Sequence, residues 1–263
     1  MKQVYVITGA SSGIGFALCR YLAQHDKQVV AIARRRAQLD MLKDEFPKLI
    51  TVISADLAVQ GDRNKVIQQL SSVERILGLV NNAATNDPIA LVEDFPLEEW
   101  HRQIAINVDA PIFLTKGLLP FLKNGRIINI TTGTTNFVVS GVVGYAMTKA
   151  AINVFSKYLS AELQSEKILV AAAHPGIVKT GLIESIISHN DPSLGISKAQ
   201  KHFEQDEKYL DANISAKFIG WLLLDAADEL YTGDIIGIYN QKYQPLWHDK
   251  LIDSPYPSHI APP

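Results

Sequence analysis

The chain has 263 residues, of which 47% are hydrophobic and 20% are charged. This balance is typical of a globular protein and excludes long disorder. The formal net charge of -2 gives no basic excess that would favour nucleic acid or an anionic membrane. The single cysteine, Cys19, excludes an internal disulfide and a cysteine-based zinc site, and it suits a reducing compartment.

The beginning of the chain leaves no room for the apolar stretch of a signal peptide, because a glycine stands at position nine. The apolar run 218–224 is too short to span a bilayer. None of the seven histidines forms a spaced pair typical of a metal site. We therefore expect a cytoplasmic protein with no membrane, nucleic-acid or metal partner.

Short β-branched runs alternate with longer amphipathic stretches along the chain. The runs predict strands at 4–8, 28–33, 49–54, 76–81, 126–132, 168–173 and 235–239. The amphipathic stretches predict helices at 14–24, 37–46, 62–73, 96–122, 145–164 and 212–226. Because the strands are continuously apolar and alternate with helices, we expect βαβ units that build one parallel sheet in a single domain, 1–263.

Two segments fall outside this alternation. The stretch 181–210 is weakly periodic and contains Asp191, Pro192 and Gly195, so we expect a mobile excursion from the sheet edge that serves substrate binding. The stretch 241–263 carries five prolines and is expected to form an extended tail, packed on a surface or partly loose.

A glycine-rich turn, Thr8–Gly15, follows the first predicted strand and opens the first predicted helix. Glycine permits the unusual backbone angles of a sharp strand-to-helix turn and lets the backbone approach a pyrophosphate. The helix start offers unpaired N–H groups to phosphates, although an ordinary βα turn can have the same composition. The residues expected to bind a dinucleotide here are Thr8, Gly9, Ser11, Ser12, Gly13, Ile14 and Gly15.

The residues after the second predicted strand indicate which nicotinamide coenzyme is bound. An Asp or Glu in this place binds the ribose 2′-OH of NAD, whereas arginine accommodates the 2′-phosphate of NADP. No acidic residue occurs between Lys27 and Leu39, and Ala33 is followed by Arg34 and Arg35. We therefore expect NADP(H), the alternative being that these arginines form only a solvated helix start.

Tyr145 and Lys149 are four residues apart at the start of a predicted helix and therefore share one face of it. The lysine charge is expected to lower the pKa of Tyr145 and make its phenol a general acid near neutral pH. Thr132 lies at the end of a predicted strand, where ligands bind in open α/β sheets. We expect a catalytic hydroxyl there, with a purely structural threonine as the alternative.

Two further polar residues are candidates for the site. Asn107 lies in an apolar helical stretch, where an amide must be hydrogen-bonded or exposed, and we expect a link to Lys149 through water or backbone. Asp56, just after the third predicted strand, is expected either to accept from the adenine amino group or to be a solvated turn residue.

Together these motifs resemble the short-chain dehydrogenase/reductase family over residues 3–240. They are TGASSGIG at 8–15, NNAA at 81–84, Asn107, NITT ending at Thr132, YAMTK at 145–149 and PGIVKT at 175–180. The resemblance implies an α/β fold with a doubly wound (Rossmann) parallel sheet of about seven strands and helices on both faces. It also implies NAD(P)(H)-dependent oxidoreduction.

The resemblance further implies roles for single residues. Tyr145 donates the proton, Lys149 also holds the nicotinamide ribose, and Asn107 anchors a water relay to Lys149. Val178 and Thr180 meet the carboxamide. The coenzyme-binding residues expected beyond the glycine turn are Arg34, Arg35, Asp56, Leu57, Asn82, Ala83, Ala84, Tyr145, Lys149, Pro175, Gly176, Val178 and Thr180.

The chain departs from the family pattern at two positions. Thr132 stands where the family usually has serine, which keeps the hydroxyl but narrows the pocket with a methyl group. Ala84 stands where the family usually has the glycine of NNAG. The first departure predicts altered substrate choice or weak activity, and the second is expected to be tolerated.

The main hypothesis is an NADPH-dependent carbonyl reductase whose catalytic residues are Tyr145, Lys149, Thr132 and Asn107. The apolar residues in 133–144 and 182–187 suit a small apolar or aromatic ketone or diketone. The alternatives are a catalytically weak NADP(H)-binding sensor or scaffold and an NAD-dependent alcohol dehydrogenase of the same family. Helices 96–122 and 145–164 are apolar on more than one face, which predicts a homodimer or homotetramer.

Overall fold

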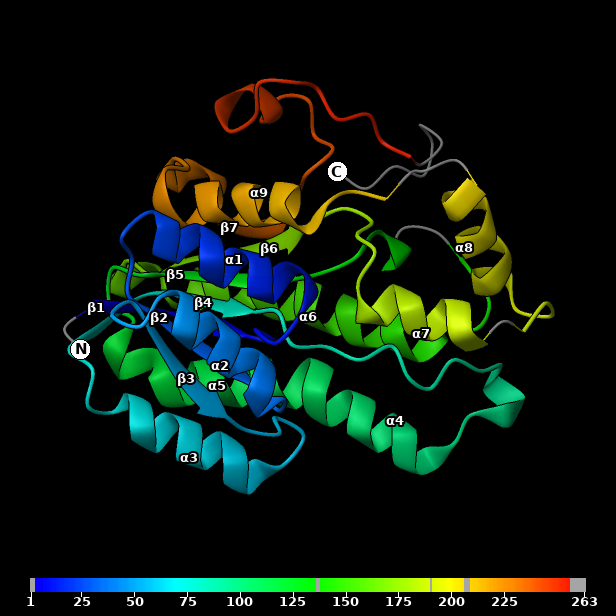
Figure 1. Ribbon diagram of the computed structural model, residues 1–263, viewed down its shortest axis with the longest axis horizontal. Coiled ribbons are helices and arrows are strands. Elements are labelled where there is room, and N and C mark those ends of the chain that lie inside the picture. The colour runs from blue at the N-terminus through cyan, green and yellow to red at the C-terminus, as the bar shows by residue number, and fades with distance from the viewer. Residues whose placement is uncertain (1–2, 136–137, 190, 206–208, 256–263) are drawn as a thin grey trace.

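The computed structural model describes residues 3–135, 138–189, 191–205 and 209–255. At its centre lies a seven-stranded, parallel sheet in the order β3-β2-β1-β4-β5-β6-β7 (Figure 1). The strands are β1 Gln3–Thr8, β2 Val29–Ala33, β3 Ile50–Ser54, β4 Arg75–Asn81, β5 Arg126–Ile130, β6 Leu169–His174 and β7 Thr232–Gly237. The predicted doubly wound sheet is confirmed.

Helices cover both faces of this sheet, because its strands are apolar on both sides. One face carries α1 (Gly13–Gln24), α2 (Arg36–Glu45) and α9 (Ala212–Leu224). The other face carries α3 (Gln60–Leu70), α5 (Ala110–Leu118) and α6 (Val143–Glu162). Each face has its own cluster of buried strand and helix side chains.

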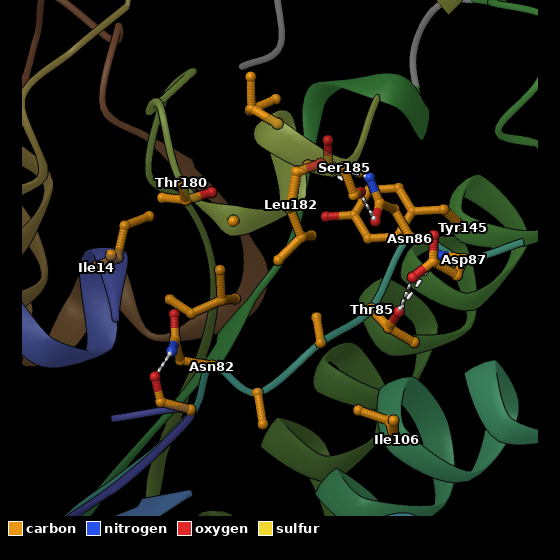
Figure 2. A pocket seen from close by; sticks show the side chains of 18 of the residues that line it. Ile14, Asn82, Thr85, Asn86, Asp87, Ile106, Tyr145, Thr180, Leu182 and Ser185 are labelled. Carbon is orange, nitrogen blue, oxygen red and sulfur yellow. Dashed lines mark hydrogen bonds between the residues drawn. The ribbon is translucent and has the colours of Figure 1, made fainter. Parts of the chain in front are cut away.

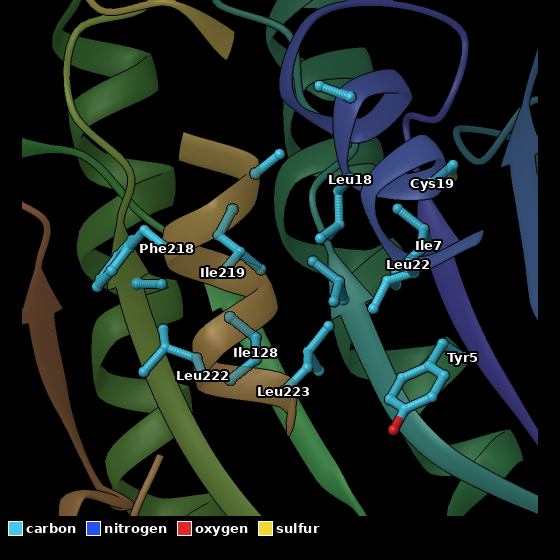
Figure 3. Close-up of a cluster of buried hydrophobic side chains, with 14 of the residues drawn as sticks. Tyr5, Ile7, Leu18, Cys19, Leu22, Ile128, Phe218, Ile219, Leu222 and Leu223 are labelled. Carbon is cyan, nitrogen blue, oxygen red and sulfur yellow. The ribbon is translucent and has the colours of Figure 1, made fainter. Parts of the chain in front are cut away.

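The packing of α1 on the sheet determines where the start of that helix lies. Leu18 and Leu22 of α1 and Ile219 and Leu222 of α9 are completely buried together over the strands (Figure 3). Burying each such side chain contributes roughly 1.5–3 kcal/mol. These contacts hold the N-terminus of α1 next to the carboxyl end of β1.

The strand order reverses beside β1, with β2 and β3 on one side and β4 to β7 on the other. In open α/β sheets, ligands bind outside the carboxyl ends of the strands at such a reversal. The loops that leave β1, β2, β4, β5 and β6 all begin at this edge, so they surround one place from different parts of the chain.

The predicted helix 96–122 is one continuous helical stretch with an irregular middle. It consists of α4 (Leu97–Ile104), a π-helical turn (Ala105–Asp109), α5 and a short 3-10 turn. The predicted strand 126–132 was two residues too long, since β5 ends at Ile130 and the chain leaves the sheet before Thr132. The hydroxyl residues 131 and 132 thus lie at the rim of the sheet.

The stretch 181–210, predicted as a mobile excursion from the sheet edge, is largely helical, and its mobility and its part in substrate binding stay predictions. It forms α7 (Gly181–His189) and α8 (Gly195–Gln205), which pack against each other. Their buried side chains Ile186, Leu194 and Ile196 join Ile89 and Val142 in a third apolar cluster, separate from the two faces of the sheet. Pro192 and Gly195 interrupt the periodicity between two helices that are each short, which explains why the pattern looked weak.

The C-terminal tail is described as far as residue 255, and this part packs on the domain. Trp247 is buried against Phe218 of α9, and the Gln244 side chain bonds the backbone of Ile238 and Ile252. The predicted extended tail therefore holds a compact turn where it is described, and the rest of 241–263 lies outside the described residues.

One helical stretch among the described residues, Leu97–Phe121, has the length and apolar composition of a membrane-spanning helix. Its most apolar part is 39% buried inside the protein. It consists of α4, the π-helical turn, α5 and the 3-10 turn. Here α5 packs against α3 and the sheet, and α4 packs against α6. A helix that is apolar on several sides is equally typical of a protein core.

Candidate active site

A cleft of about 740 Å³ runs along the carboxyl ends of the strands. Its walls come from the loops after β1 to β6 and from α4, α6, α7 and α8. Figure 2 shows how side chains of these separate segments point into it, with Ile14 and Thr180 at one end and Tyr145, Asn86 and Ser185 at the other.

The turn between β1 and α1 has the backbone geometry that the sequence predicted. Gly9 and Gly13 both have positive φ angles, 69° and 53°. A Cβ atom at Gly9 would lie 2.7 Å from the Nδ2 atom of Asn82, and one at Gly13 would lie 2.7 Å from the Cγ2 atom of Thr180. Only glycine fits both positions, and the absence of side chains leaves the cleft floor open to a ligand.

The start of α1 is free to bind an anion. Ser12 is the N-cap residue, yet its side chain makes no capping hydrogen bond, and the first turn contains no acidic residue. Uncapped N–H groups and the positive end of the helix dipole attract phosphate. The turn therefore suits a pyrophosphate in two ways. Its glycines leave space for the ligand, and the start of α1 offers free N–H groups to it.

Thr8 and Gly15, both predicted to touch the coenzyme, do not line the cleft. Thr8 Oγ1 instead accepts from the N–H groups of Asn82 (2.9 Å) and Ala83 (3.0 Å), which fastens the end of β1 to the loop after β4. Gly15 lies against the carbonyl of Gly9, where a Cβ atom would approach to 2.4 Å. Both residues therefore shape the turn, and their predicted contact with the coenzyme stays a prediction.

Arginine side chains form the wall after β2. Arg35 donates to Ser11 Oγ through Nε (3.1 Å) and Nη2 (3.0 Å), and its Nη2 atom also donates to Ser12 Oγ (2.6 Å). Arg34 is exposed and lines the cleft, whereas Arg36 points elsewhere and pairs with Asp40. Two guanidinium groups and two hydroxyls thus converge on one end of the cleft.

Asp56 lies at the same end but is already engaged. Its Oδ1 atom accepts from the N–H of Ala58 (3.0 Å), and its Oδ2 atom accepts from Arg102 Nη2 of α4 (2.8 Å). Desolvation opposes ionisation of Asp56, but the hydrogen bonds from Arg102 and Ala58 outweigh it and lower its pKa. The predicted contact with an adenine amino group stays a prediction, and Arg102 is a cleft residue that the sequence did not indicate.

Tyr145 and Lys149 project together from the first turns of α6, as predicted. Lys149 is 3% exposed, its Nζ atom lies 5.6 Å from the centroid of the Tyr145 ring, and Nζ donates to the carbonyl of Ile130 (2.8 Å). Burial lowers the pKa of Lys149 to about 8. This lysine therefore changes its charge close to neutral pH.

The expected lowering of the Tyr145 pKa was wrong for the protein without ligands. Burial raises the pKa of Tyr145 to about 12, and a hydrogen bond with Thr132 opposes that rise. Desolvation of the phenolate is the largest cause of this rise, and the hydrogen bond with Thr132 is too weak to offset it. Tyr145 therefore keeps its proton across the physiological pH range.

Thr132 is the partner of Tyr145 at the cleft. Its side chain hydrogen-bonds the phenol of Tyr145, and its Oγ1 atom accepts from the N–H of Thr134 (3.3 Å). The hydroxyl of Thr134 lies 3.4 Å from the same atom. The Thr132 hydroxyl thus stands beside the phenol and the Thr134 hydroxyl stands next to Thr132, both in a loop that begins where β5 leaves the sheet.

Asn107 is buried in the π-helical turn and fully engaged, which confirms that its amide is held rather than exposed. It is 1% exposed; its Oδ1 atom accepts from Thr85 N (2.9 Å), and its Nδ2 atom donates to Thr85 O (2.8 Å) and Thr148 Oγ1 (3.0 Å). Among the described residues no direct side-chain bond joins Asn107 to Lys149. The water link between them stays a prediction.

The remaining predicted coenzyme residues do line the cleft: Ile14, Leu57, Asn82, Ala83, Ala84, Pro175, Gly176, Val178 and Thr180. The cleft also contains Thr85, Asn86 and Asp87, which follow the NNAA motif and were not predicted. The sequence could have indicated these three residues only by their position directly after that motif. Beyond them, Ile186, Ile196 and Val142 give the Tyr145 end of the cleft an apolar wall.

Comparison with known proteins gives a consistent result. A family model described as short chain dehydrogenase matches residues 3–191. The chain is 25% identical over 262 residues to the benzil reductase ((S)-benzoin forming) of Saccharomyces cerevisiae, covering 94% of this chain and 99% of that protein. A crystal structure of a short-chain dehydrogenase/reductase from the same yeast has a TM-score of 0.86 at 24% identity, over 94% of this chain and 100% of that one.

Solved structures with this fold contain either coenzyme. A closed form of serine dehydrogenase complexed with NADP+ has a TM-score of 0.77 at 24% identity, over 89% of this chain and 93% of that one. A 3-ketoacyl-(acyl-carrier-protein) reductase from Brucella melitensis complexed with NADH has a TM-score of 0.77 at 22% identity, over 90% of this chain and 96% of that one. The fold therefore leaves the coenzyme preference to the residues around the cleft.

Proposed function

This chain belongs to the short-chain dehydrogenase family, and from that premise we propose that it is an NADPH-dependent reductase of small apolar or aromatic ketones and diketones. It is an oxidoreductase of that family and binds a nicotinamide coenzyme. The observation that carries the finer proposal is one cleft with arginines at one end and the hydrogen-bonded pair of Tyr145 and Thr132 at the other.

The preference for NADPH is argued from the arginine end of the cleft. Arg34, Arg35 and the hydroxyl of Ser11 would hold a 2′-phosphate there, since a guanidinium binds phosphate in a bidentate manner. Ala33 at the end of β2 offers no carboxylate to the 2′-OH of NADH. Asp56 is an acid on this wall, and Arg102 already binds it.

The bound coenzyme supplies the hydride. The chain's own residues orient the substrate and deliver the proton. The hydroxyls of Tyr145 and Thr132 stand side by side and both donate to a carbonyl oxygen placed between them, which stabilises the negative charge that develops there. Tyr145 then gives its proton to that oxygen. Lys149 is fixed by the carbonyl of Ile130 beneath the phenol, where its charge favours proton release.

The protonation of Tyr145 bears on the direction of the reaction. A phenol whose pKa is raised to about 12 is protonated at neutral pH, as a general acid must be before it acts. Oxidation of an alcohol requires the same group as a base and hence as phenolate. A protonated Tyr145 is therefore ready to act as the acid in reduction at neutral pH, and oxidation of an alcohol by the same residue becomes faster as the pH rises.

The substrate end of the cleft combines apolar side chains with the hydroxyls and with the polar side chains of Asn86 and Asp87. Val139, Val142, Ile186 and Ile196 line it, so that an aromatic or branched ketone buries apolar area on binding. Thr134 adds a second hydroxyl next to Thr132, which suits a second carbonyl oxygen beside the reacting one. A similar protein is a benzil reductase, which by its name acts on an aromatic diketone.

The test is the loss of NADPH absorbance with a panel of ketones and diketones that includes benzil. We expect turnover by the wild-type protein, loss of at least roughly 1000-fold in Tyr145→Phe, and no loss in Tyr158→Phe, an exposed tyrosine on the same helix. Turnover that survives Tyr145→Phe contradicts the mechanism. NADPH binding without turnover of any carbonyl supports the sensor or scaffold alternative, which Thr132→Ser then tests by restoring activity.

We also propose that the protein is a homodimer or homotetramer of a reducing, cytoplasmic environment. Support for the first comes from the exposed side chains Phe113 of α5 and Met147, Val154 and Tyr158 of α6. Support for the second is the single cysteine, Cys19, which is buried and free. Neither proposal affects the chemistry of the cleft.

A further inference from the structure

Helix α7 is joined to the opposite wall of the cleft by one side chain. Asn86 belongs to the segment after β4 and is only 3% exposed. Its Nδ2 atom donates to the carbonyl of Leu182 (2.7 Å), and its Oδ1 atom accepts from the hydroxyl of Ser185 (2.9 Å), so that both ends of the amide bind the first turns of α7. These bonds join residues 96 and 99 positions apart in the chain (Figure 2).

We propose that Asn86 is a positioning residue whose amide latches α7 over the substrate and sets the lid in register with the helix that carries Tyr145. The proposal rests on the proposed function, because it assigns α7 the part of a lid above a carbonyl substrate. Leu182, Ile183 and Ser185 of α7 all line the cleft, and the partly buried Tyr145 and Ile183 pack against the same apolar cluster.

The latch continues into a path of hydrogen bonds toward the phenol. Residue 85, next to the latch, is held at both its N–H and its carbonyl by the Asn107 side chain. Asn107 also donates to Thr148 Oγ1, and Thr148 Oγ1 donates to the carbonyl of Tyr145 (2.8 Å). A displacement of α7 that pulls on Asn86 therefore reaches the first turn of α6 through neighbouring, buried contacts.

The second helix of the lid, α8, is hydrogen-bonded to a different segment of the chain. The Asn86 latch therefore acts on α7 and not on α8. The N–H groups of Gly195 and Ile196, at the start of α8, donate to the side chain and the carbonyl of Ser140. The α7 helix has Asn86 on its cleft side and apolar contacts elsewhere. Hydrogen bonds suit a reversible latch, because water satisfies both partners once it opens and the net cost is small.

The experiment compares variants that differ in one hydroxyl or one amide. Asn86→Ala removes both bonds. Ser185→Ala removes one of them together with the bond from the Ser185 hydroxyl to the carbonyl of Leu182 (2.9 Å) within α7, and Ser185→Thr keeps the hydroxyl. The matched control is Ser188→Ala on the same helix, since Ser188 bonds only the carbonyl of Ser185 within α7. Ser185→Ala keeps the test decisive if Asn86→Ala fails to fold, because it leaves the buried Asn86 in place.

The first measurement is amide hydrogen exchange over 181–189 in the protein without substrate, a readout that needs no activity. We expect exchange to rise roughly tenfold in Asn86→Ala and about threefold in Ser185→Ala, with Ser185→Thr and Ser188→Ala close to wild type. Equal exchange in Ser185→Ala and Ser188→Ala would overturn the latch. Faster exchange in a protein that reduces no carbonyl would leave the latch standing and refute the proposed function instead.

The second measurement separates positioning from general damage. We expect kcat/KM for the carbonyl to fall roughly tenfold in Asn86→Ala while the Kd for NADPH changes less than about twofold, because the latch lies at the substrate end of the cleft. A loss of NADPH affinity equal to the loss of kcat/KM would show a structural fault and overturn the positioning role. So would unchanged kinetics together with faster exchange.

Discussion

Burial shifts the pKa values of Lys149 and Tyr145 in opposite directions. Burial lowers the pKa of Lys149 to about 8 and raises that of Tyr145 to about 12, so each group is drawn toward its neutral form. The neutral form is the reactive one for the tyrosine, which must hold a proton. For the lysine, the charged form is the useful one, and it prevails below its pKa.

This difference predicts the pH dependence of the reaction. Below about pH 8, Lys149 is an ammonium ion and favours proton release from Tyr145, and above that pH it loses its charge. We expect kcat for reduction to be flat below about 8 and to fall about tenfold per unit above it, while Tyr145 stays protonated throughout. A pH series of initial rates checks this, and a kcat that rises above pH 8 would refute it.

In the proposed site, the preference for NADPH over NADH depends on a few side chains that bind the 2′-phosphate together. Replacing both Arg34 and Arg35 with alanine removes two charge-assisted partners, so we expect the Kd for NADPH to rise roughly 100-fold while that for NADH changes little. Arg36→Ala is the matched control, because Arg36 pairs with Asp40 outside the cleft. Fluorescence titration measures both constants, and equal losses for the two coenzymes would exclude a 2′-phosphate site here.

The helices and strands were predicted where a local pattern determines them. Continuous apolar runs located all seven strands, and the glycine turn located the start of α1, because both depend on neighbours in the sequence. Helices α7 and α8 were missed, since each is short and Pro192 separates them. Arg102 and Asn86 were missed because their partners are 46 and 96 residues away, and no local pattern carries such a contact.

The π-helical turn shows how an irregular element can serve a site. It places Asn107 where one amide holds both backbone groups of Thr85 and the hydroxyl of Thr148. We expect Asn107→Ala to lower the free energy of unfolding by about 3 kcal/mol, since it leaves several buried polar groups unpaired. Urea denaturation checks this value against Asn64→Ala, an exposed helical asparagine, and equal effects of the two changes would contradict it.

At the scale of the molecule, helices α5 and α6 expose large apolar side chains. Met147, Val154 and Tyr158 lie on one side of α6 and are 56%, 56% and 69% exposed, and Phe113 of α5 is 46% exposed. Large apolar side chains at helical spacing on a surface are typical of an interface between copies. The cleft opens at the carboxyl ends of the strands, so association through these helices leaves it accessible.

Light scattering tests this surface directly. We expect the wild-type protein to have the mass of a dimer or tetramer and Tyr158→Glu combined with Val154→Glu to shift it to a smaller species, because two buried charges in each copy destabilise an interface strongly. Glu162→Gln, on the same helix, serves as a control. A wild-type protein that is monomeric at high concentration would rule the interface out.

The proposed mechanism depends on Tyr145 giving a proton to a carbonyl that receives hydride from NADPH. Mass spectrometry of the alcohol formed from benzil, with NADPH deuterated at the transferable position, follows that event directly. We predict that the wild-type protein forms an alcohol that carries the deuterium. We predict that Tyr145→Phe forms almost none of this labelled alcohol. An unlabelled alcohol, or equal labelling by both proteins, would contradict the account.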